Sequence, residues 1–267
     1  MGRERLYRTE AVVLKRSDFG EADRVVTLYT PKRGKFRAVA KGVRRLTSRK
    51  AGHLELFTHS QLLLATARSL DIITQAETIA SFPALRTDLS RTSRAYYAAE
   101  LLDRFTGEGI ENRPLFELLL KALEWLNAES NINLLMRFYE LHLLDLVGYR
   151  PQLFNCVICG AVIEPVVNYF SPSDGGVVCP RCGRASPSPE TYPIAVNSLK
   201  ALRYLQTHSF EAVRRLRLKP ELHRELEQVM LRYLTCYLER DLKSVEFLRL
   251  AGQPAPTTPC EGESSSS

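Results

Sequence analysis

The sequence predicts an α+β protein with a small N-terminal β-barrel, an α-helical body and a four-cysteine module embedded in that body. Short runs rich in Val, Ile, Thr and Tyr fill residues 7–80, and apolar residues recur at helical spacing from residue 87 onward. Two CxxC pairs then interrupt the helical pattern. We expect the barrel at 1–80 and the helical body at 81–250, with the cysteine module at about 152–187. The Ser- and Pro-rich segment 251–267 is expected to be a disordered tail.

Five short runs justify the barrel: "TEAVVLKR", "RVVTLYT", "FRAVAKGV", "LELFTHSQLLLAT" and "LDIITQAETIA". Breakers such as "SDFGEAD" and "TPKRGK" separate the first three of them. Five strands in about 75 residues favour a closed barrel, because a flat sheet of that size would leave two edges to protect. Both an OB-like and an SH3-like barrel fit this pattern.

The helical body begins with apolar residues at helical spacing near residue 98 and again near residue 115. The stretch "NINLLMRFYELHLLDLVGYRP" is apolar almost all round, which predicts a central, buried helix that ends near Gly148 and Pro151. Helical spacing returns at Ser198–Leu205 and from Glu221 to about Arg240. Cys236 falls within this last helix and is expected to be a small core residue.

Positive charge is concentrated at the N-terminus. The chain of 267 residues has a formal net charge of +7, and its first 80 residues contain 16 Lys or Arg against 8 Asp or Glu. The other residues contain 21 against 22. This asymmetry is typical of a domain that faces nucleic acid or another anionic surface.

Nine of these cations lie between Thr30 and Lys50, a stretch without any Asp or Glu. In the strand interpretation they form a hairpin tip, one face of the next strand and the loop beyond it. They would then make a continuous track for a phosphate backbone, although a solvated basic loop is an open alternative. The candidate DNA-binding residues are Lys32, Arg33, Lys35, Arg37, Lys41, Arg44, Arg45, Arg49 and Lys50.

The sequence shows no recognition helix shaped for base edges, and aromatic residues near the basic stretch are few. We therefore expect contacts to phosphates and tolerance of sequence.

The cysteine pairs have the spacing C-x2-C-x19-C-x2-C, and Gly follows the second Cys of each pair. A two-residue gap lets one turn direct two thiolates at one ion, and we expect the Gly to adopt the left-handed backbone that closes the turn. Two such turns supply the four sulfurs of a closed tetrahedral site. We predict one structural Zn²⁺ ion bound by Cys156, Cys159, Cys179 and Cys182.

No catalytic constellation is evident, so the sequence does not predict an enzyme. Asp18, Glu21 and Asp23 suggest an acidic turn, with a Mg²⁺-dependent nuclease site as the alternative. The chain lacks a secretion signal or a long apolar stretch, which predicts no membrane association and a cytoplasmic location.

The stretch "TEAVVLKRSDFGEADRVVTLYTPKRGKFRAVAKGVRRLTSR" resembles the N-terminal signature of the bacterial RecO recombination mediators. The resemblance continues in "LHLLDLVGYRPQLFNCVICG" and "FSPSDGGVVCPRCG", and covers most of residues 6–190. It implies an OB-fold domain, a helical body and a zinc-ribbon-like module of four cysteines, with the nine cations and four cysteines named above as DNA contacts and zinc ligands. Some members of that family lack part of the cysteine set.

The resemblance further implies a non-enzymatic, nucleoid-associated protein that binds single- and double-stranded DNA and anneals complementary strands. Its implied partners are RecR, RecF, RecA and single-strand-binding protein. The alternative is a zinc-ribbon RNA-binding or transcription-associated module.

Overall fold

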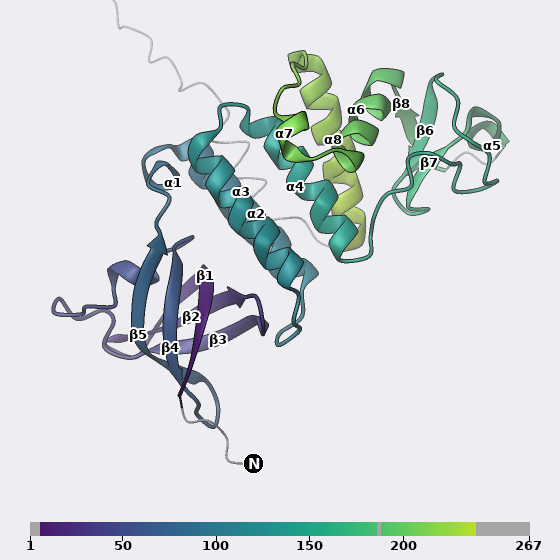
Figure 1. The fold of residues 1–267 in the computed structure, drawn as a ribbon. Coiled ribbons are helices and arrows are strands. Elements are labelled where there is room, and N and C mark those ends of the chain that lie inside the picture. The colour runs from purple at the N-terminus through teal and green to yellow at the C-terminus, as the bar shows by residue number, and fades with distance from the viewer. Residues whose placement is uncertain (1–5, 186–187, 239–267) are drawn as a thin grey trace, which may run out of the picture.

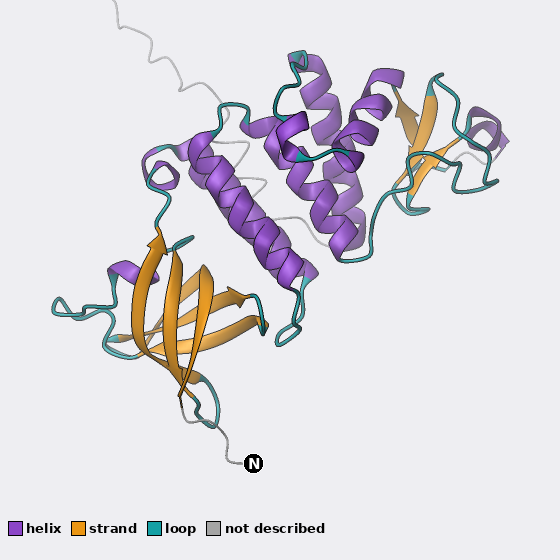
Figure 2. Ribbon diagram, in the orientation of Figure 1, coloured by secondary structure: helices purple, strands orange, loops and turns teal. Residues whose placement is uncertain are grey.

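The computed structural model describes residues 6–185 and 188–238. A β-barrel lies at one end, a group of helices lies in the middle, and a small sheet with its loops lies at the other end (Figure 1). Figure 2 shows the strands in two groups, the barrel and the small sheet, with most of the helices between them, so the molecule has the α+β character that the sequence predicts. The predicted tail at 251–267 lies outside the described residues, as does any part of the last helix beyond Leu238.

The barrel contains β1 (Leu6–Phe19), β2 (Asp23–Thr30), β3 (Gly34–Ala40), β4 (His59–Ala65) and β5 (Asp71–Ala80). Its strands close in the order β1-β2-β3-β5-β4, with β3 and β5 parallel and the other pairs antiparallel. β1 is long because its first half pairs with β4 and its second half with β2, and a bulge between Val13 and Lys15 lies within the β2-paired half.

The predicted strand that begins at residue 54 starts later in the structure. A 3₁₀ helix, η1 (Gly52–Leu54), and a turn in which Thr58 N–H donates to Glu55 O (3.1 Å) take up its first residues. Phe57 there has a φ of 63°, which no strand residue adopts. Strand pairing therefore begins at His59.

Side chains of alternate strand residues divide between two cores. Those directed inward fill the barrel and include Val13, Val26 and Leu28. Those directed outward from the same strands include Val12, Leu14 and Tyr29, which are buried in the core of the helical body. The barrel is thus joined to the helices by a shared apolar contact.

The helices next to the barrel are α1 (Ala84–Thr87), α2 (Leu89–Phe105), α3 (Arg113–Ala128) and α4 (Ile132–Leu146). Asp88, Asn112 and Asn131 cap α2, α3 and α4 by accepting backbone N–H groups of the first turn. α4 is buried on most of its circumference, as its sequence predicts, and it ends just before Gly148.

The C-terminal part contains β6 (Asn168–Ser171), β7 (Gly176–Val178), α5 (Pro180–Ala185), β8 (Tyr192–Ile194), α6 (Val196–Thr207), α7 (Phe210–Val213) and α8 (Pro220–Leu238). The three strands form a sheet in the order β7-β6-β8. The interpretation of Cys236 as a core residue is wrong, since its side chain is exposed. Cys236 lines an open hollow together with Tyr192 and Pro189.

Substitution of Gly34, which lies where the barrel meets the helices, is expected to destabilise the protein. The φ of Gly34 is 54°, and a Cβ atom there would overlap the carbonyl oxygen of Ile110 in the loop between α2 and α3. We expect Gly34→Ala to cost about 1–2 kcal/mol for the left-handed backbone and about 1–3 kcal/mol more for the overlap. Gly20→Ala is the matched control, because Gly20 has a φ of 59° and open space around it. Equal losses in urea unfolding would contradict this prediction.

Candidate nucleic-acid interface and metal centre

The nine predicted cations differ in how far other groups of the protein compensate their charge. Five of them are held by other groups of the protein, and their partners include carboxylates that the basic stretch itself lacks. The other four have exposed side chains and no carboxylate partner among the described residues. The held cations are Arg33, Lys35, Arg37, Arg44 and Lys50, and the exposed ones without such a partner are Lys32, Lys41, Arg45 and Arg49.

Lys35 is part of the contact between barrel and helices. Its side chain is only 12% exposed, and its Nζ atom lies 3.0 Å from Asp103 Oδ1 near the end of α2. Lys15 pairs with the same carboxylate from β1. The carbonyl of Lys35 accepts a hydrogen bond from Gly109 N–H (2.8 Å), and Arg37 pairs with Glu108 (3.1 Å). The acidic end of α2 and its following loop therefore neutralise the cations of β3.

The ion pairs of Asp103 with Lys15 and Lys35 are expected to lose their stabilising effect in acid. Burial alone would raise the pKa of Asp103, but hydrogen bonds from Lys15 and Lys35 outweigh it and lower that pKa below 3.8. The carboxylate therefore stabilises the fold fully above pH 3.8, and this contribution is lost as the pH falls through the lower folded-state value. We expect the melting temperature of the Asp103→Asn variant to fall less than that of the parent between pH 5 and pH 3. Parallel curves would contradict this prediction.

Arg33 closes one end of the barrel. Its guanidinium lies 4.7 Å from the centre of the Phe36 ring and 5.0 Å from that of Tyr7, and it pairs with Asp71 (2.9 Å). Three separate strands and the β2–β3 turn meet at this cluster. Arg33 thus contributes to the fold of the barrel, although half of its side chain is exposed.

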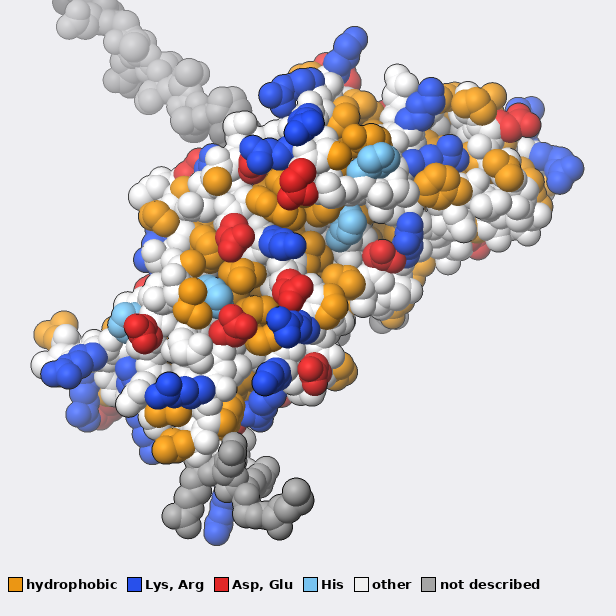
Figure 3. Space-filling view, viewed as in Figure 1, with side chains coloured by type: hydrophobic (Ala, Val, Ile, Leu, Met, Phe, Trp, Pro, Cys, Tyr) orange, Lys and Arg blue, Asp and Glu red, His pale blue; other side chains and the backbone are white. Residues whose placement is uncertain are grey.

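The segment 41–51 forms a loop that projects from the barrel beside η1 (Figure 1). Figure 3 shows Lys and Arg side chains on this projection, with a hydrophobic side chain at its far end. Lys41, Arg45 and Arg49 are exposed here and have no carboxylate partner among the described residues. This loop is the part of the predicted track where positive charge is least compensated.

The acidic turn between β1 and β2 supports the base of that loop. Asp18 pairs with Arg24 (3.0 Å) and Arg44 (3.4 Å), and Asp23 accepts a hydrogen bond from Gly42 N–H (2.7 Å). Within residues 6–185 and 188–238, the cysteines form the only cluster suited to a metal ion. Of the three acidic residues of the predicted turn, Glu21 lies in the turn itself, while Asp18 and Asp23 lie at the ends of β1 and β2 that flank it. The alternative of a Mg²⁺ site at these residues finds no cluster.

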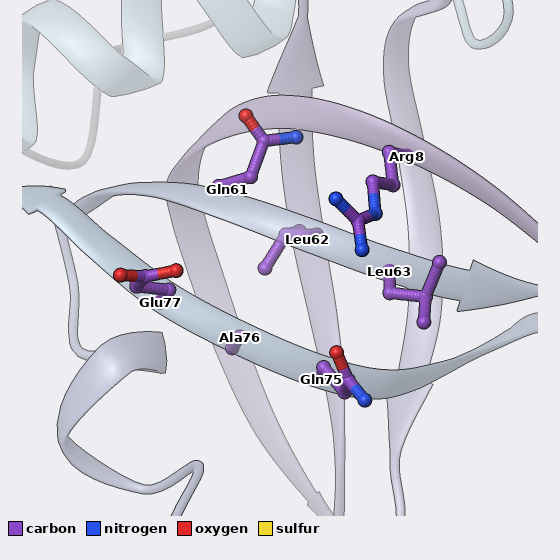
Figure 4. A pocket seen from close by; sticks show the side chains of 7 residues that line it. All are labelled: Arg8, Gln61, Leu62, Leu63, Gln75, Ala76 and Glu77. Carbon is purple, nitrogen blue, oxygen red and sulfur yellow. The ribbon is translucent and has the colours of Figure 1, made fainter.

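A shallow hollow of ≈ 340 Å³ lies on β1, β4 and β5 (Figure 4). The strand register places Arg8 opposite Leu63 and Leu63 opposite Gln75. One Arg and one Glu balance each other among its lining residues, so this hollow does not extend the positive surface. It is lined by Arg8, Gln61, Leu62, Leu63, Gln75, Ala76 and Glu77.

Sequence reasoning did not single out Arg24 or Lys15. Arg24 shares Asp18 with Arg44 and so belongs to the base of the projecting loop. The short hairpin between β1 and β2 places Arg24 opposite Asp18, so this ion pair could have been predicted from the sequence. The ion pair of Lys15 could not have been predicted in this way, because its partner Asp103 lies in a helix 88 residues away.

The four cysteines meet at one point, as predicted. Their sulfur atoms all lie within 4.8 Å of one another, and the sulfurs of Cys159 and Cys179 are 3.8 Å apart. Tetrahedral Zn–S bonds of about 2.3 Å require sulfurs about 3.8 Å apart, so the four residues fit a single ion of this kind. The cluster lies between the loop that follows α4 and the start of α5.

The protonation behaviour of the thiols also fits a bound cation. Burial would raise the pKa of Cys156, but backbone N–H groups, first that of Cys179, donate to its sulfur and lower the pKa to about 6. Hydrogen bonds with Cys179 and Cys159 raise the pKa of Cys182 to about 12. Four sulfurs so close together cannot all be thiolates unless a cation balances them.

The two glycines of the cysteine pairs differ from each other. Gly160 has a φ of 73°, the left-handed backbone that its place after the second Cys predicts. The same expectation is wrong for Gly183, which lies in helix α5. A Cβ atom at Gly183 would come within 2.5 Å of the Tyr169 ring, so close packing explains this glycine.

Fold and site together define a class of protein: a basic β-barrel joined to a helical body that contains a four-cysteine centre. Among the described residues, no helix combines the length and the apolar character that crossing a bilayer needs.

Two protein families match the chain in sequence. The family described as "Recombination protein O N terminal" matches residues 3–82, and "Recombination protein O C terminal" matches residues 86–246. The protein named "DNA repair protein RecO" from Roseiflexus is 50% identical over 92% of this chain and 86% of its own length. A protein of that name from Pelotomaculum thermopropionicum is 39% identical over 93% of this chain and 96% of its own length. One from Dehalococcoides mccartyi is 38% identical over 92% of this chain and 97% of its own length. The chain therefore belongs to the RecO family.

Proposed function

We propose that this protein is a DNA-binding and strand-annealing mediator of recombinational DNA repair. In this proposal it acts with RecR and RecF to help RecA replace single-strand-binding protein, and it performs no catalytic step. Its place would be the cytoplasm, on the nucleoid. Membership of the RecO family and relatives named as DNA repair proteins support this role.

The barrel topology supports an OB fold. The order β1-β2-β3-β5-β4, with β1 next to both β2 and β4, is that of a five-stranded Greek-key barrel. Barrels of this kind bind oligonucleotides on the face around β2 and β3. In this chain the projecting loop of residues 41–51 follows β3 directly.

One observation carries the proposal: four of the nine predicted cations are exposed and lack a carboxylate partner among the described residues, one of them in the turn before β3 and three in the loop after it. We propose that they make the first phosphate contacts. Arg37 and Arg44, exposed but paired, would extend this surface. Arg33, Lys35 and Lys50 would hold its shape, because their charged ends contact Asp71, Asp103 and the carbonyl of Ile73. The first contacts are thus Lys32, Lys41, Arg45 and Arg49.

The mechanism is electrostatic. Each cation that meets a phosphate releases condensed counterions, which favours binding at low salt. Two complementary strands repel each other through their phosphates, so a surface that neutralises both lowers the barrier to pairing. Sequence tolerance follows, since phosphates carry no base identity.

We propose Zn²⁺ as the ion of the cysteine cluster. Cys156, Cys159, Cys179 and Cys182 would fill all four positions of a tetrahedral ion, which leaves none for a substrate. The ion would stabilise the loops between α4 and α6, and its role would be structural.

Strand annealing tests the proposal. Two complementary fluorescent DNA strands, each coated with single-strand-binding protein, should anneal faster with this protein, and RecR should change that rate. RNA strands of the same sequence should bind no better than DNA. A clear preference for RNA, or no acceleration of annealing, would contradict the proposal.

A further inference from the structure

The tip of the projecting loop presents an apolar side chain to solvent. Ser48 N–H donates to the carbonyl of Arg45 (2.9 Å), which closes a turn with Leu46 and Thr47 at its centre. Leu46 is fully exposed, more so than any other large hydrophobic residue that the structure describes. Turn centres favour Gly, Pro, Asn, Asp and Ser, so local folding gives no reason for Leu at this place.

A single exposed leucine carries little meaning alone, because scattered apolar residues are normal on protein surfaces. The rest of the loop gives Leu46 its significance. Arg45 precedes it directly and Arg49 follows three residues later, both exposed and both without a carboxylate partner among the described residues. The apolar tip is therefore flanked on both sides by uncompensated positive charge.

The protein holds this loop at both ends. At its start, Gly42 N–H donates to Asp23 (2.7 Å) and Arg44 N–H to the carbonyl of Ala22 (3.0 Å). At its end, Lys50 donates through Nζ to the carbonyl of Ile73 (3.0 Å). These hydrogen bonds fix both ends of the loop, so its tip loses less conformational entropy when it binds a ligand.

We propose that Leu46 is a wedge that enters the base stack of the bound DNA while Arg45 and Arg49 contact the phosphates on either side. This inference rests on the proposed DNA binding and adds to it a contact with the bases. Apolar wedges of this kind partly unstack a base step, and the cost is offset by the surface that the distorted strand can contact. A leucine makes the contact without reading base identity, in keeping with sequence tolerance.

The composition of the loop favours DNA over other partners. Its other large aliphatic side chain, Val43, is buried, so one leucine is all the apolar surface that the tip offers. A protein interface takes about 800 Å² from each partner, and a membrane-bound helix buries a whole apolar face. A single apolar side chain is enough to enter one base step that has been opened by unstacking.

The test uses a single-stranded oligonucleotide with 2-aminopurine at several positions, because this base becomes brighter when it is unstacked. Wild-type protein should raise its fluorescence. Leu46→Ser should abolish the rise and weaken binding about tenfold, as expected for the loss of a largely buried leucine. Leu46→Met should restore both, and the slope of binding against salt should not change in either variant, because phosphate contacts remain.

Leu89→Ser is the matched control, since Leu89 is also exposed but lies at the start of α2. It should leave affinity and fluorescence unchanged, and all variants should melt as wild type does. Wild-type affinity and fluorescence in Leu46→Ser would overturn the wedge. Binding to anionic lipid vesicles should be measured in parallel, and a Leu46→Ser variant that loses only vesicle binding would also overturn it. Failure of wild type to bind DNA would instead contradict the proposed function.

Discussion

Replacing Cys182 with Ser is expected to abolish metal binding and unfold the cysteine module. Removing one of the four sulfurs would leave an incomplete set of ligands for the proposed tetrahedral ion. Structural zinc contributes about 10–16 kcal/mol of apparent binding free energy in small zinc-dependent folds, so the loss should be large. Metal content of the purified protein and its thermal melting measure the effect. We expect one zinc ion per chain in the parent and none in the variant, with a new transition at lower temperature.

The matched control for this prediction is Cys236→Ser. Cys236 is an exposed cysteine in α8, outside the cluster. Its replacement should leave metal content unchanged and alter stability by no more than about 0.5 kcal/mol. Treating the parent with a strong chelator should reproduce the Cys182→Ser melting curve. Retention of one ion per chain by Cys182→Ser would show that the cluster is not the metal site.

Replacing Arg137 with Met is expected to destabilise the helical body by about 3–5 kcal/mol. Arg137 and Glu140 are both buried in α4, and Arg137 Nη2 lies 2.5 Å from Glu140 Oε1. Tyr97 in α2 donates to the same oxygen (2.8 Å), and Glu227 in α8 lies 4.0 Å from Arg137. The variant leaves the carboxylate of Glu140 buried without its cation.

The double variant Arg137→Met with Glu140→Gln provides the control. Burial raises the pKa of Glu140, so a neutral group suits its position, and glutamine keeps an acceptor for Tyr97. We expect the double variant to recover most of the lost free energy of unfolding in urea, because no uncompensated charge remains. A double variant as unstable as Arg137→Met would mean that lost packing, and not the buried charge, causes the effect.

Much of the fold could be predicted because its signals are local. Apolar residues alternate in "RVVTLYT" and recur at helical spacing around Leu115–Leu126, because those residues face a core. The asparagine and glycine at the two ends of α4 mark its limits in the same way. The cysteine cluster was predictable for a related reason, since the CxxC spacing itself constrains where the sulfurs can lie.

The pairing of the cations could not be predicted, because their partners are distant in sequence. Asp103 is 68 residues from Lys35, and Asp71 is 38 residues from Arg33. Only the docking of α2 against the barrel brings Asp103 to β3. A run of positive charge in a sequence therefore overstates the charge that remains free on the surface, and the tertiary fold selects which cations stay uncompensated.

We propose that the uncompensated cations of the projecting loop bind DNA phosphates, and the salt dependence of binding measures this contact. Fluorescence anisotropy with single-stranded DNA should compare the parent with a Lys41→Gln, Arg45→Gln, Arg49→Gln variant. The matched control, Arg215→Gln, Arg217→Gln, Lys219→Gln, removes three exposed cations of the helical body that have no described ion pair.

Each phosphate contact contributes about 0.7 to the log–log salt slope of single-stranded DNA. We expect the loop variant to flatten the slope by about two and the control to keep the parent's slope. Equal slopes in all three proteins, or equal flattening in both variants, would contradict the claim.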